Sequence, residues 1–332
     1  MNFDYSEEQQ LLADSVRRFL QNKYQFEDRK KIIAGEGWSS DVWAKLAEMG
    51  LTGLPLSPDY GGFGGGAVDL MSVMEAFGEA LVLEPLLPTL MAARLVGRAA
   101  SDAQKRALLP AVAEGRLRMV FAASPKANVV GAPAAHKLLC LLEKDLFIAD
   151  AAEVPMKPYR TLDNMLAARI DFSPSKADLL AKDAGAAVEE ALDFATALVC
   201  AEAVGAMKFS CDTTLEYLKT RKQFGVPIGT FQALQHRIVD MFISYEQAKS
   251  MACLACSKVD SSENPAERAR AVSAAKIKVA DAARHVSQES VQLHGGMGMS
   301  EELKVSHSFR RLTVLARQCG DADHHLERFA SL

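Results

Sequence analysis

Long helical runs dominate the C-terminal half of this chain and most constrain how it can fold. Residues from about Ala186 to Thr220 are mostly Ala, Leu, Val and Glu, and a second run extends from Phe231 to about Val259. A third run, from Asn264 to His294, opens with Asn-Pro-Ala-Glu, in which Asn suits the N-cap and Pro the first helical position. A shorter run covers about Glu301 to Gln318. Long helices joined by short links predict a bundle over residues 176–332.

The N-terminal part of the chain also predicts helices. Ser6 precedes apolar residues at helical spacing, and Ser101 with Gln104 forms the pattern of a capping box. Between these helices, Pro58 to Gly66 contains many glycines and predicts a loop, because each glycine inside a helix costs ~1 kcal/mol. We expect an N-terminal helical domain over residues 1–116.

The middle of the chain has a different pattern. RMVFAAS, KLLCLL, DLFIAD and ARIDFS are short apolar runs separated by Pro, Lys and Asp, as is typical of strands. They predict a small β domain over residues 117–175, which would need the helices to cover its apolar face. The predicted fold class is therefore mostly α with a small β domain, in the order helices, sheet, four-helix bundle.

Charge and composition exclude several classes of protein. The net charge of −4 argues against a nucleic-acid partner, which normally meets a basic surface. The polar, acidic opening MNFDYSEEQQ predicts no secretory signal, and the apolar runs are too short to predict a membrane span. The scattered cysteines, including Cys253 and Cys256 within an apolar helix, are interpreted as buried thiols of a cytoplasmic protein.

Two stretches carry more specific signals than packing requires. RKQFGVPIGTFQ, from Arg221 to Gln232, places a cation and an aromatic residue at a helix end, with a Gly/Pro turn before the next helix. A turn with a helix N-terminus suits a phosphate, and Arg adds charge-assisted donors. QLHGGMG, from Gln292 to Gly298, closes a helix rather than opening one and is not a Rossmann motif. Each alone is also compatible with an ordinary helix corner or capping loop.

Together these stretches resemble the acyl-CoA dehydrogenase family. The resemblance rests on RKQFGVPIGTFQALQH, QLHGGMG and PDYGGFGGG, and the helix AEAVGAMKFSCDTTLEYLKTRKQFG also fits. It covers both helical regions well and the middle region poorly. In detail the chain resembles the small subunits of pimeloyl-CoA-type dehydrogenases, which include members of two-subunit enzymes. This implies an acyl-CoA dehydrogenase-like fold whose middle β domain is shortened.

The resemblance implies a flavoprotein in which FAD lies between the subunits of a dimer. Carried over to this chain, the FAD contacts are Arg221, Phe224, Gln232, Gln292, Gly295 and Gly296. Arg221 would pair with phosphate, Phe224 would offer an aromatic face, and the glycines would let backbone approach closely. In the family the first stretch touches the diphosphate and adenosine side, and the glycine loop of the neighbouring subunit closes over the adenosine.

The implied reaction is α,β-desaturation of an acyl-CoA thioester, in which a carboxylate takes the α-proton and the flavin accepts a hydride from the β-carbon. The α-proton is weakly acidic, so the base needs a desolvated site and a raised pKa. Counting back from Leu326-Glu327-Arg328 places Asp321 at the position of the family's Glu, although counting forward from Gly295 gives a slightly longer stretch than usual. Asp321 is therefore the predicted catalytic base, with an N-cap of the last helix as the alternative.

Other acidic or metal-binding candidates are weaker. Some family members carry the base on an earlier helix, at a position that is Ala195 here. Glu202, two helical turns later, is interpreted as a helix-interior residue that pairs with a neighbour. Asp323, His324 and His325 are adjacent in sequence and cannot all converge on one ion from a helix, so no metal site is predicted.

Two functions remain open. The first is an FAD-dependent acyl-CoA dehydrogenase, or a subunit of one. The second is a non-catalytic accessory subunit, which the short middle region and the Asp in place of Glu favour; Ala123-Ser124-Pro125 is the only echo of the family's flavin-ring segment. The implied partners are an acyl-CoA substrate and an electron-transfer flavoprotein as electron acceptor. The chain would form a homodimer or homotetramer, or a heterotetramer with a longer acyl-CoA dehydrogenase subunit.

Overall fold

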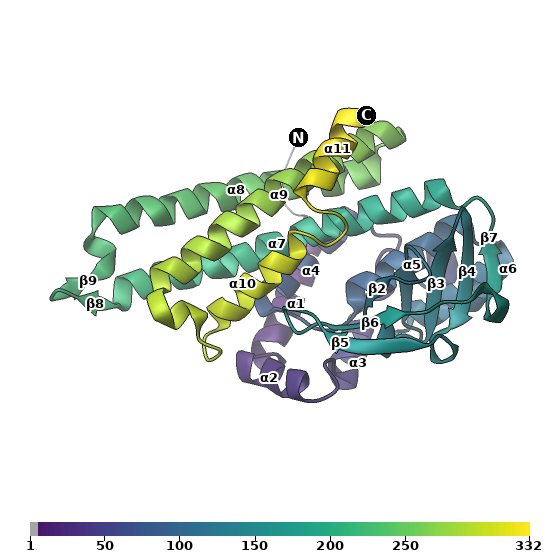
Figure 1. Ribbon diagram of the computed structural model, residues 1–332, viewed down its shortest axis with the longest axis horizontal. Coiled ribbons are helices and arrows are strands. Elements are labelled where there is room, and N and C mark those ends of the chain that lie inside the picture. The colour runs from purple at the N-terminus through teal and green to yellow at the C-terminus, as the bar shows by residue number, and fades with distance from the viewer. Residues whose placement is uncertain (1–5) are drawn as a thin grey trace. The chain divides into compact units, whose positions relative to one another are not determined.

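The computed structural model describes residues 6–332, which are mainly helical with a small β region (Figure 1). The helices are α1 Glu7–Lys23, α2 Phe26–Ala34, α3 Ser40–Glu48, α4 Ala67–Ala80, α5 Leu86–Ala99, α6 Asp102–Ala113, α7 Gly185–Thr220, α8 Gln232–Ser261, α9 Pro265–His294, α10 Lys304–Leu315 and α11 Ala322–Ser331. The strands are β1 Met119–Ala122, β2 Asn128–Val130, β3 Lys137–Leu142, β4 Asp145–Asp150, β5 Met156–Arg160, β6 Leu166–Ile170, β7 Asp178–Ala181, β8 Lys222–Gln223 and β9 Val226–Pro227.

Contacts divide the chain into two compact units, each made of separate stretches of sequence. The helical unit contains the described residues up to Glu27, Met71–Val82 and Thr196–Leu332. The sheet unit contains Asp28–Leu70 and Leu83–Ala195. The division passes through α2, α4 and α7. The three domains expected from the sequence follow the order of elements along the chain, and their limits stay a prediction.

The sheet unit contains two small sheets. One has the strand order β1-β3-β4-β7, with β1 and β3 parallel and the other pairs antiparallel. The other has the order β2-β6-β5 and is antiparallel. The alternate side chains that face inward form a core of buried residues, which includes Val120, Leu138, Cys140, Ala168, Ile170 and Phe172. Both sheets are too small to be stable alone, so this shared core is what holds them.

Helices of the same unit are fastened by side chains that bond to backbone. The Trp43 indole N–H donates to the carbonyl of Gly115 at 2.7 Å, and the Thr52 hydroxyl donates to Ala113 at 2.8 Å. Both carbonyls lie at the end of α6, where an α-helix leaves acceptors without helical partners. These bonds fix α3 and the segment after it to α6 just before β1 begins.

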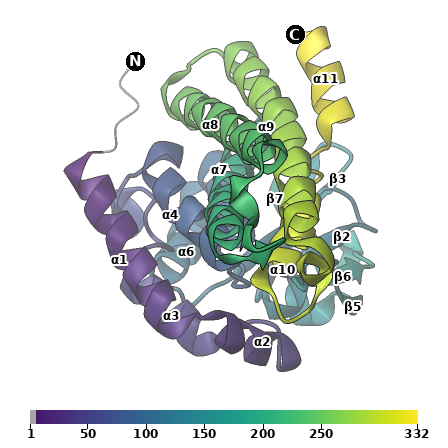
Figure 2. The same ribbon diagram turned by 90° about the vertical axis from the view of Figure 1, so that its left-hand side faces the viewer.

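Long helices make the core of the helical unit. α8 and α9 lie side by side along most of their length, and α11 lies at the opposite end of this bundle from the β8–β9 hairpin (Figures 1 and 2). Buried hydroxyl pairs join α7 to its neighbours, with Ser210 and Ser308 at 2.9 Å and Thr214 and Ser290 at 2.8 Å. These four hydroxyls therefore pair with one another, which offsets the cost of burying them in an apolar core.

Two glycines allow α4 and α7 to cross at backbone contact. A Cβ atom at Gly205 would lie 1.8 Å from the carbonyl oxygen of Glu75, and one at Gly78 would lie 1.9 Å from that of Glu202. Real Cβ atoms do not approach so closely, so any side chain at either position would push the helices apart.

The sequence pattern predicts most of these elements correctly. The long helical runs are α7, α8 and α9, Ser6 caps α1, and Ser101 and Gln104 form the expected capping box. The apolar runs correspond to β1, β3, β4 and β6. β2, β5 and β7 have no such signal because they are short or mostly exposed; β5, for example, reads Met-Lys-Pro-Tyr-Arg.

Within the described residues, α7 is the one helix long and apolar enough to cross a membrane. However, 89% of the most apolar stretch of this helix is buried inside the protein. The six cysteines are free thiols. Burial raises the pKa of Cys140, Cys200 and Cys211 to about 12, so these thiols are unreactive near neutral pH.

Candidate functional site

The corner between α7 and α8 contains the first predicted cofactor motif. α7 ends at Thr220, β8 and β9 form a hairpin, and α8 begins at Gln232. Phe224 and Gly225 form the tip of the hairpin with φ angles of 54° and 82°. The left-handed backbone turns the chain sharply and leaves Phe224 91% exposed. The ring of Phe231 lies edge-on to that of Phe224, with the ring centroids 6.1 Å apart. The corner thus presents an aromatic side chain to its surroundings.

Arg221 lies just before this hairpin and its backbone is held firmly. Its N–H donates to Tyr217 and its carbonyl accepts from Ile228, both at 2.8 Å. Its side chain is exposed and has no hydrogen bond or ion pair with any described residue. A fixed Cα with an unengaged guanidinium is suited to binding an external anion.

The second motif forms the loop after α9. α9 ends at His294, and Gly295–Met299 form a 3₁₀ turn in which Gly295 has a φ of 62°. A Cβ atom at Gly295 or Gly296 would meet nothing within 4 Å, whereas one at Gly298 would lie 2.5 Å from the carbonyl oxygen of Val291. Packing within the chain therefore explains why residue 298 is a glycine, but it does not explain the glycine at residue 296. The open space beside Gly295 and Gly296 leaves their backbone accessible to a ligand.

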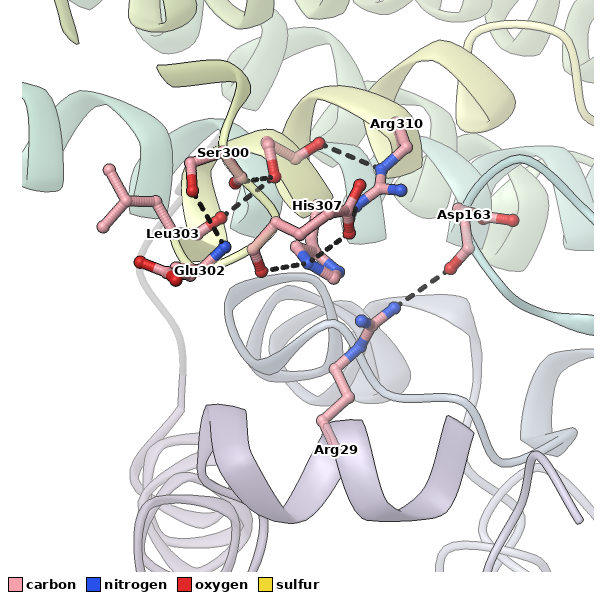
Figure 3. A network of polar contacts seen from close by, with 9 residues as sticks. Arg29, Asp163, Ser300, Glu302, Leu303, His307 and Arg310 are labelled. Carbon is pink, nitrogen blue, oxygen red and sulfur yellow. Dashed lines mark hydrogen bonds and ion pairs between the residues drawn. The ribbon is translucent and has the colours of Figure 1, made fainter. Parts of the chain in front are cut away.

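Polar contacts anchor the chain that follows this loop (Figure 3). The Ser306 hydroxyl donates to the carbonyl of Ser300 at 2.7 Å, and Arg310 donates to the carboxylate of Glu301 at 2.8 Å. His307 is buried and packs edge-on against Phe26 at 4.8 Å. Together these contacts fix the loop to the first turns of α10. Figure 3 also shows the separate bond that Arg29 donates to the carbonyl of Asp163 in the sheet unit, at 3.0 Å.

The two motifs meet in one cavity of the helical unit, with a volume of 570 Å³. Of the predicted cofactor residues, the cavity is lined by Arg221, Gln292, Gly295 and Gly296. Both segments therefore come from the same chain, whereas the family resemblance implies a glycine loop supplied by the neighbouring subunit. Phe224 and Gln232 do not line this cavity.

No role was assigned from the sequence to Tyr217, His294 and Arg237, which also line this cavity. Tyr217 stacks on His294 with ring centroids 4.4 Å apart and planes at 27°, and Arg237 also lines the cavity. Arg237 forms two hydrogen bonds to Glu289, at 2.6 and 3.0 Å. Burial lowers the pKa of His294, so its ring is neutral. Tyr217 lies one helical turn before Arg221, and this spacing is the signal that could have identified it.

The chemistry of this cavity fits one end of FAD. Arg221 supplies a cation for the diphosphate, the glycine loop supplies accessible backbone, and the Tyr217–His294 stack supplies a flat aromatic wall for an adenine. A cation beside a flat aromatic wall is the combination that a diphosphate joined to an adenine would need, so these residues fit the adenosine diphosphate half of the cofactor.

Asp321 has the geometry of a helix cap. It is the N-cap of α11, and its carboxylate accepts the backbone N–H of His324 at 3.0 Å. The residue is exposed. The hydrogen bond from His324 lowers the pKa of Asp321, in the direction opposite to that expected of a buried general base.

The other candidates from the sequence have structural partners. Glu202 forms a buried ion pair with Arg311, which confirms its interpretation as a helix-interior residue paired with a neighbour. Ala195 is buried and has no acidic group. Cys256 is buried, and its thiol contacts the carbonyl of Ala197, so it packs in the core as expected. Among residues 6–332, no group of His, Cys, Asp and Glu is arranged to hold a metal ion.

Comparison with known proteins assigns the family. Residues 6–116 match the model of the acyl-CoA dehydrogenase N-terminal domain, and residues 184–330 match that of the C-terminal domain. The acyl-CoA dehydrogenase IpdE2 of Mycolicibacterium smegmatis is 30% identical over 328 residues, which cover 97% of this chain and 98% of that protein.

Two solved structures have the same fold. The ChsE4–ChsE5 complex from Mycobacterium tuberculosis matches with a TM-score of 0.89 and 21% identity, over 100% of this chain and 98% of that one. A variant of the Tcur3481–Tcur3483 steroid ACAD matches with a TM-score of 0.87 and 25% identity, over 98% of this chain and 97% of that one. The chain therefore belongs to the acyl-CoA dehydrogenase family, whose members are FAD-dependent oxidoreductases that act on CH–CH bonds.

Proposed function

We propose that this chain is a subunit of a heteromeric acyl-CoA dehydrogenase, of the pimeloyl-CoA dehydrogenase small-subunit type, that desaturates an acyl-CoA thioester. The observation that carries the proposal is the cavity in which Arg221 and the glycine loop meet. The two solved structures that share the fold of this chain are named as assemblies of two different proteins. One of these is a steroid ACAD, so steroid-derived acyl-CoA thioesters should be tested as substrates beside straight-chain ones.

Within this function, the residues of the chain bind the cofactor and handle a proton. Arg221 neutralises the diphosphate, and the backbone at Gly295 and Gly296 lies against the adenosine half. Phe224 and Gln232 are outside this cavity, and we assign them to cofactor contacts made by the assembled subunits. FAD, when bound, accepts the hydride that leaves the β-carbon. Asp321 takes the α-proton on its carboxylate, once assembly desolvates it and frees it from the His324 N–H.

A second candidate is an accessory subunit that contributes the adenosine side of the FAD site while its partner supplies the base. The exposed position of Asp321, its capping bond and its lowered pKa favour this alternative. Under both candidates Arg221 and the glycine loop have the same role.

Exposed apolar side chains support an assembly. Val239, Phe242 and Ile243 share one face of α8 and are 52%, 55% and 48% exposed. A row of this kind at helical spacing is typical of a protein interface. We propose that α8 contributes to an interface with a longer acyl-CoA dehydrogenase subunit or a second copy, in the cytoplasm, and that an electron-transfer flavoprotein reoxidises the flavin. Light scattering that finds an FAD-bound monomer would contradict this assembly.

The decisive experiment compares Asp321→Asn with the parent in the assembly that co-purifies from the native host. Asn keeps the shape and can still cap α11. If Asp321 is the base, α-proton exchange and flavin bleaching by acyl-CoA fall by about 100-fold or more, with FAD content unchanged. Asp323→Asn, which replaces an exposed acid two residues away, is the matched control. Full activity of Asp321→Asn would reject the base and favour the accessory subunit.

A further inference from the structure

The link between α10 and α11 contains an unusual turn directly before Asp321. Cys319 and Gly320 are both left-handed, with φ angles of 60° and 100°. This backbone is unfavourable by roughly 1–2 kcal/mol for a residue with a Cβ atom such as Cys319. A Cβ at Gly320 would lie 2.5 Å from Cδ2 of His324 and 2.9 Å from Nε2 of His325. The turn therefore needs contacts from elsewhere to hold it.

His325 makes one of these contacts. The residue is 2% exposed, and its ring places Nε2 2.9 Å from the carbonyl oxygen of Cys319 and Nδ1 3.3 Å from the hydroxyl of Ser273 on α9. A carbonyl oxygen can only accept, so Nε2 carries the proton. Burial lowers the pKa of His325 to about 4, so the ring is neutral and Nδ1 must accept from Ser273.

Arg328 sets the direction of this hydrogen-bonded row. Its guanidinium lies 3.5 Å from the Ser273 hydroxyl oxygen and can only donate to it. The hydroxyl proton of Ser273 is therefore directed to His325, and His325 donates to Cys319. The bonds from Arg328 to Ser273, from Ser273 to His325 and from His325 to Cys319 therefore run in one direction, and such bonds strengthen one another in a buried site.

α9 supplies a second contact one helical turn further on. The ammonium group of Lys276, which is 1% exposed, donates to the carbonyl of Leu315 at the end of α10. The thiol of Cys319 is also hydrogen-bonded to Thr196 on α7. The link is thus held at its start by Lys276 and at the strained turn by His325 and Thr196.

From this arrangement we infer that His325, oriented by Ser273, is a positioning residue for Asp321. It holds the turn from Cys319 to Asp321 and thereby decides where the Asp321 carboxylate lies. The inference rests on the proposed role of Asp321 as the base. The Asp321 carboxylate accepts a hydrogen bond from His324 in the first turn of the same helix, so the turn before α11 determines where the carboxylate lies. A shift of ~1 Å in a catalytic group can reduce a rate by about 100-fold.

The test uses the FAD-loaded assembly and three variants. His325→Leu removes both ring nitrogens, Ser273→Ala removes only the group that orients the ring, and His325→Gln restores a donor near the position of Nε2. His285→Leu is the matched control, because His285 forms a comparable bond with Ser244 at 2.8 Å between α8 and α9. Amide hydrogen exchange of residues 319–324 reports on the turn, and kcat, KM and FAD content report on the reaction.

We expect amide exchange at residues 319–324 to rise in His325→Leu and kcat to fall by roughly tenfold or more, with KM and FAD content unchanged. Ser273→Ala should produce a smaller change in the same direction, and His325→Gln should recover part of the loss. If His325→Leu acted only by loosening the packing of the helical unit, FAD content would fall as well. The control His285→Leu would then show a similar fall in kcat and a similar rise in amide exchange.

Unchanged exchange and kcat in His325→Leu would overturn the inference. If His325→Leu does not fold, amide exchange at residues 319–324 and kcat are measured in Ser273→Ala instead, and no change in either would overturn the inference. Failure of the proposed base is distinguishable, because Asp321→Asn would then turn over like the parent. In that case the exchange data alone decide, and a rise in His325→Leu still supports His325 as the residue that holds the turn.

Discussion

Glu202 of α7 and Arg311 of α10 form an ion pair that is almost completely buried. Arg311 contacts the same carboxylate oxygen through Nε at 2.7 Å and through a terminal nitrogen at 2.5 Å, and the side chains are 4% and 6% exposed. The pair lies beside the glycine-mediated crossing of α4 and α7, since the Glu202 carbonyl oxygen is 1.9 Å from where a Cβ of Gly78 would be. An acid with this partner is a structural element of the helical unit.

Removing one member of this pair should be costly. Arg311→Leu leaves the Glu202 carboxylate buried without its partner, and we expect a loss of about 3–5 kcal/mol in the free energy of unfolding. Replacing both residues by Met should recover much of this loss. Arg284→Leu breaks an exposed pair with Asp281 and should cost at most about 1 kcal/mol. Urea denaturation measures all three, and equal losses for Arg311→Leu and Arg284→Leu would contradict the prediction.

Gly205→Ala should destabilise the helical unit because its Cβ would lie 1.8 Å from the carbonyl oxygen of Glu75. Overpacking of this kind costs about 1–3 kcal/mol. Gly97 is the control, because it lies within α5 and a Cβ there would meet nothing within 4 Å. Gly97→Ala should stabilise by roughly 0.5–1 kcal/mol through helix propensity. Thermal melts of the two variants should shift in opposite directions, and a parallel shift would refute the close-crossing argument.

Arg221→Ala should weaken FAD binding. A hydrogen bond to a charged group contributes about 1.5–3 kcal/mol, so Kd should rise by roughly ten- to a hundredfold. Arg221→Lys keeps the charge but loses the planar donor pair, and an intermediate Kd is expected. Lys219→Ala, at the same helix end but paired with Glu216, should bind FAD like the parent. Flavin fluorescence titration of the assembly gives each Kd, and normal binding by Arg221→Ala would exclude this contact.

The protein should lose stability on mild acidification through His325. Burial first, and then the charges of Lys276, His324 and Arg328, lower its pKa from 6.5 to about 4. Between these values the unfolded chain binds a proton that the folded chain does not, so stability is complete above pH 6.5 and falls below it. We expect a loss of about 2 kcal/mol between pH 7 and pH 5. Denaturation of His325→Gln should show a smaller loss over this range; an identical loss would mean that other groups are responsible.

Thr89 of α5 contains a buried hydroxyl oxygen with no hydrogen-bond partner among the described residues. Thr89→Val has the same shape and removes that unsatisfied group, so we expect stability to be unchanged or to rise by about 1 kcal/mol. Thr214→Val is the counterpart, because it removes a hydroxyl that is bonded to Ser290 and should destabilise. Calorimetry distinguishes the two, and destabilisation by Thr89→Val would show that its hydroxyl has a partner in solution.

The sequence by itself determined the features that depend on neighbours in the chain. Helix ends follow from caps such as Ser6, Ser101 and Asn264, whose side chains bond to backbone two or three residues away. The stretches at Arg221 and Gly295, which we propose to bind FAD, could also be recognised in the sequence, because each is a continuous run of residues.

Only the tertiary structure decided which distant residues meet. Glu202 pairs with Arg311, Tyr217 stacks on His294, and His325 bonds to Ser273, and all three partners lie on other helices or much later in the chain. The short strands β2, β5 and β7 likewise exist only because other strands pair with them. Local bonds close small loops and leave a pattern in the sequence, whereas these contacts depend on helix crossings and strand pairings that no short segment specifies.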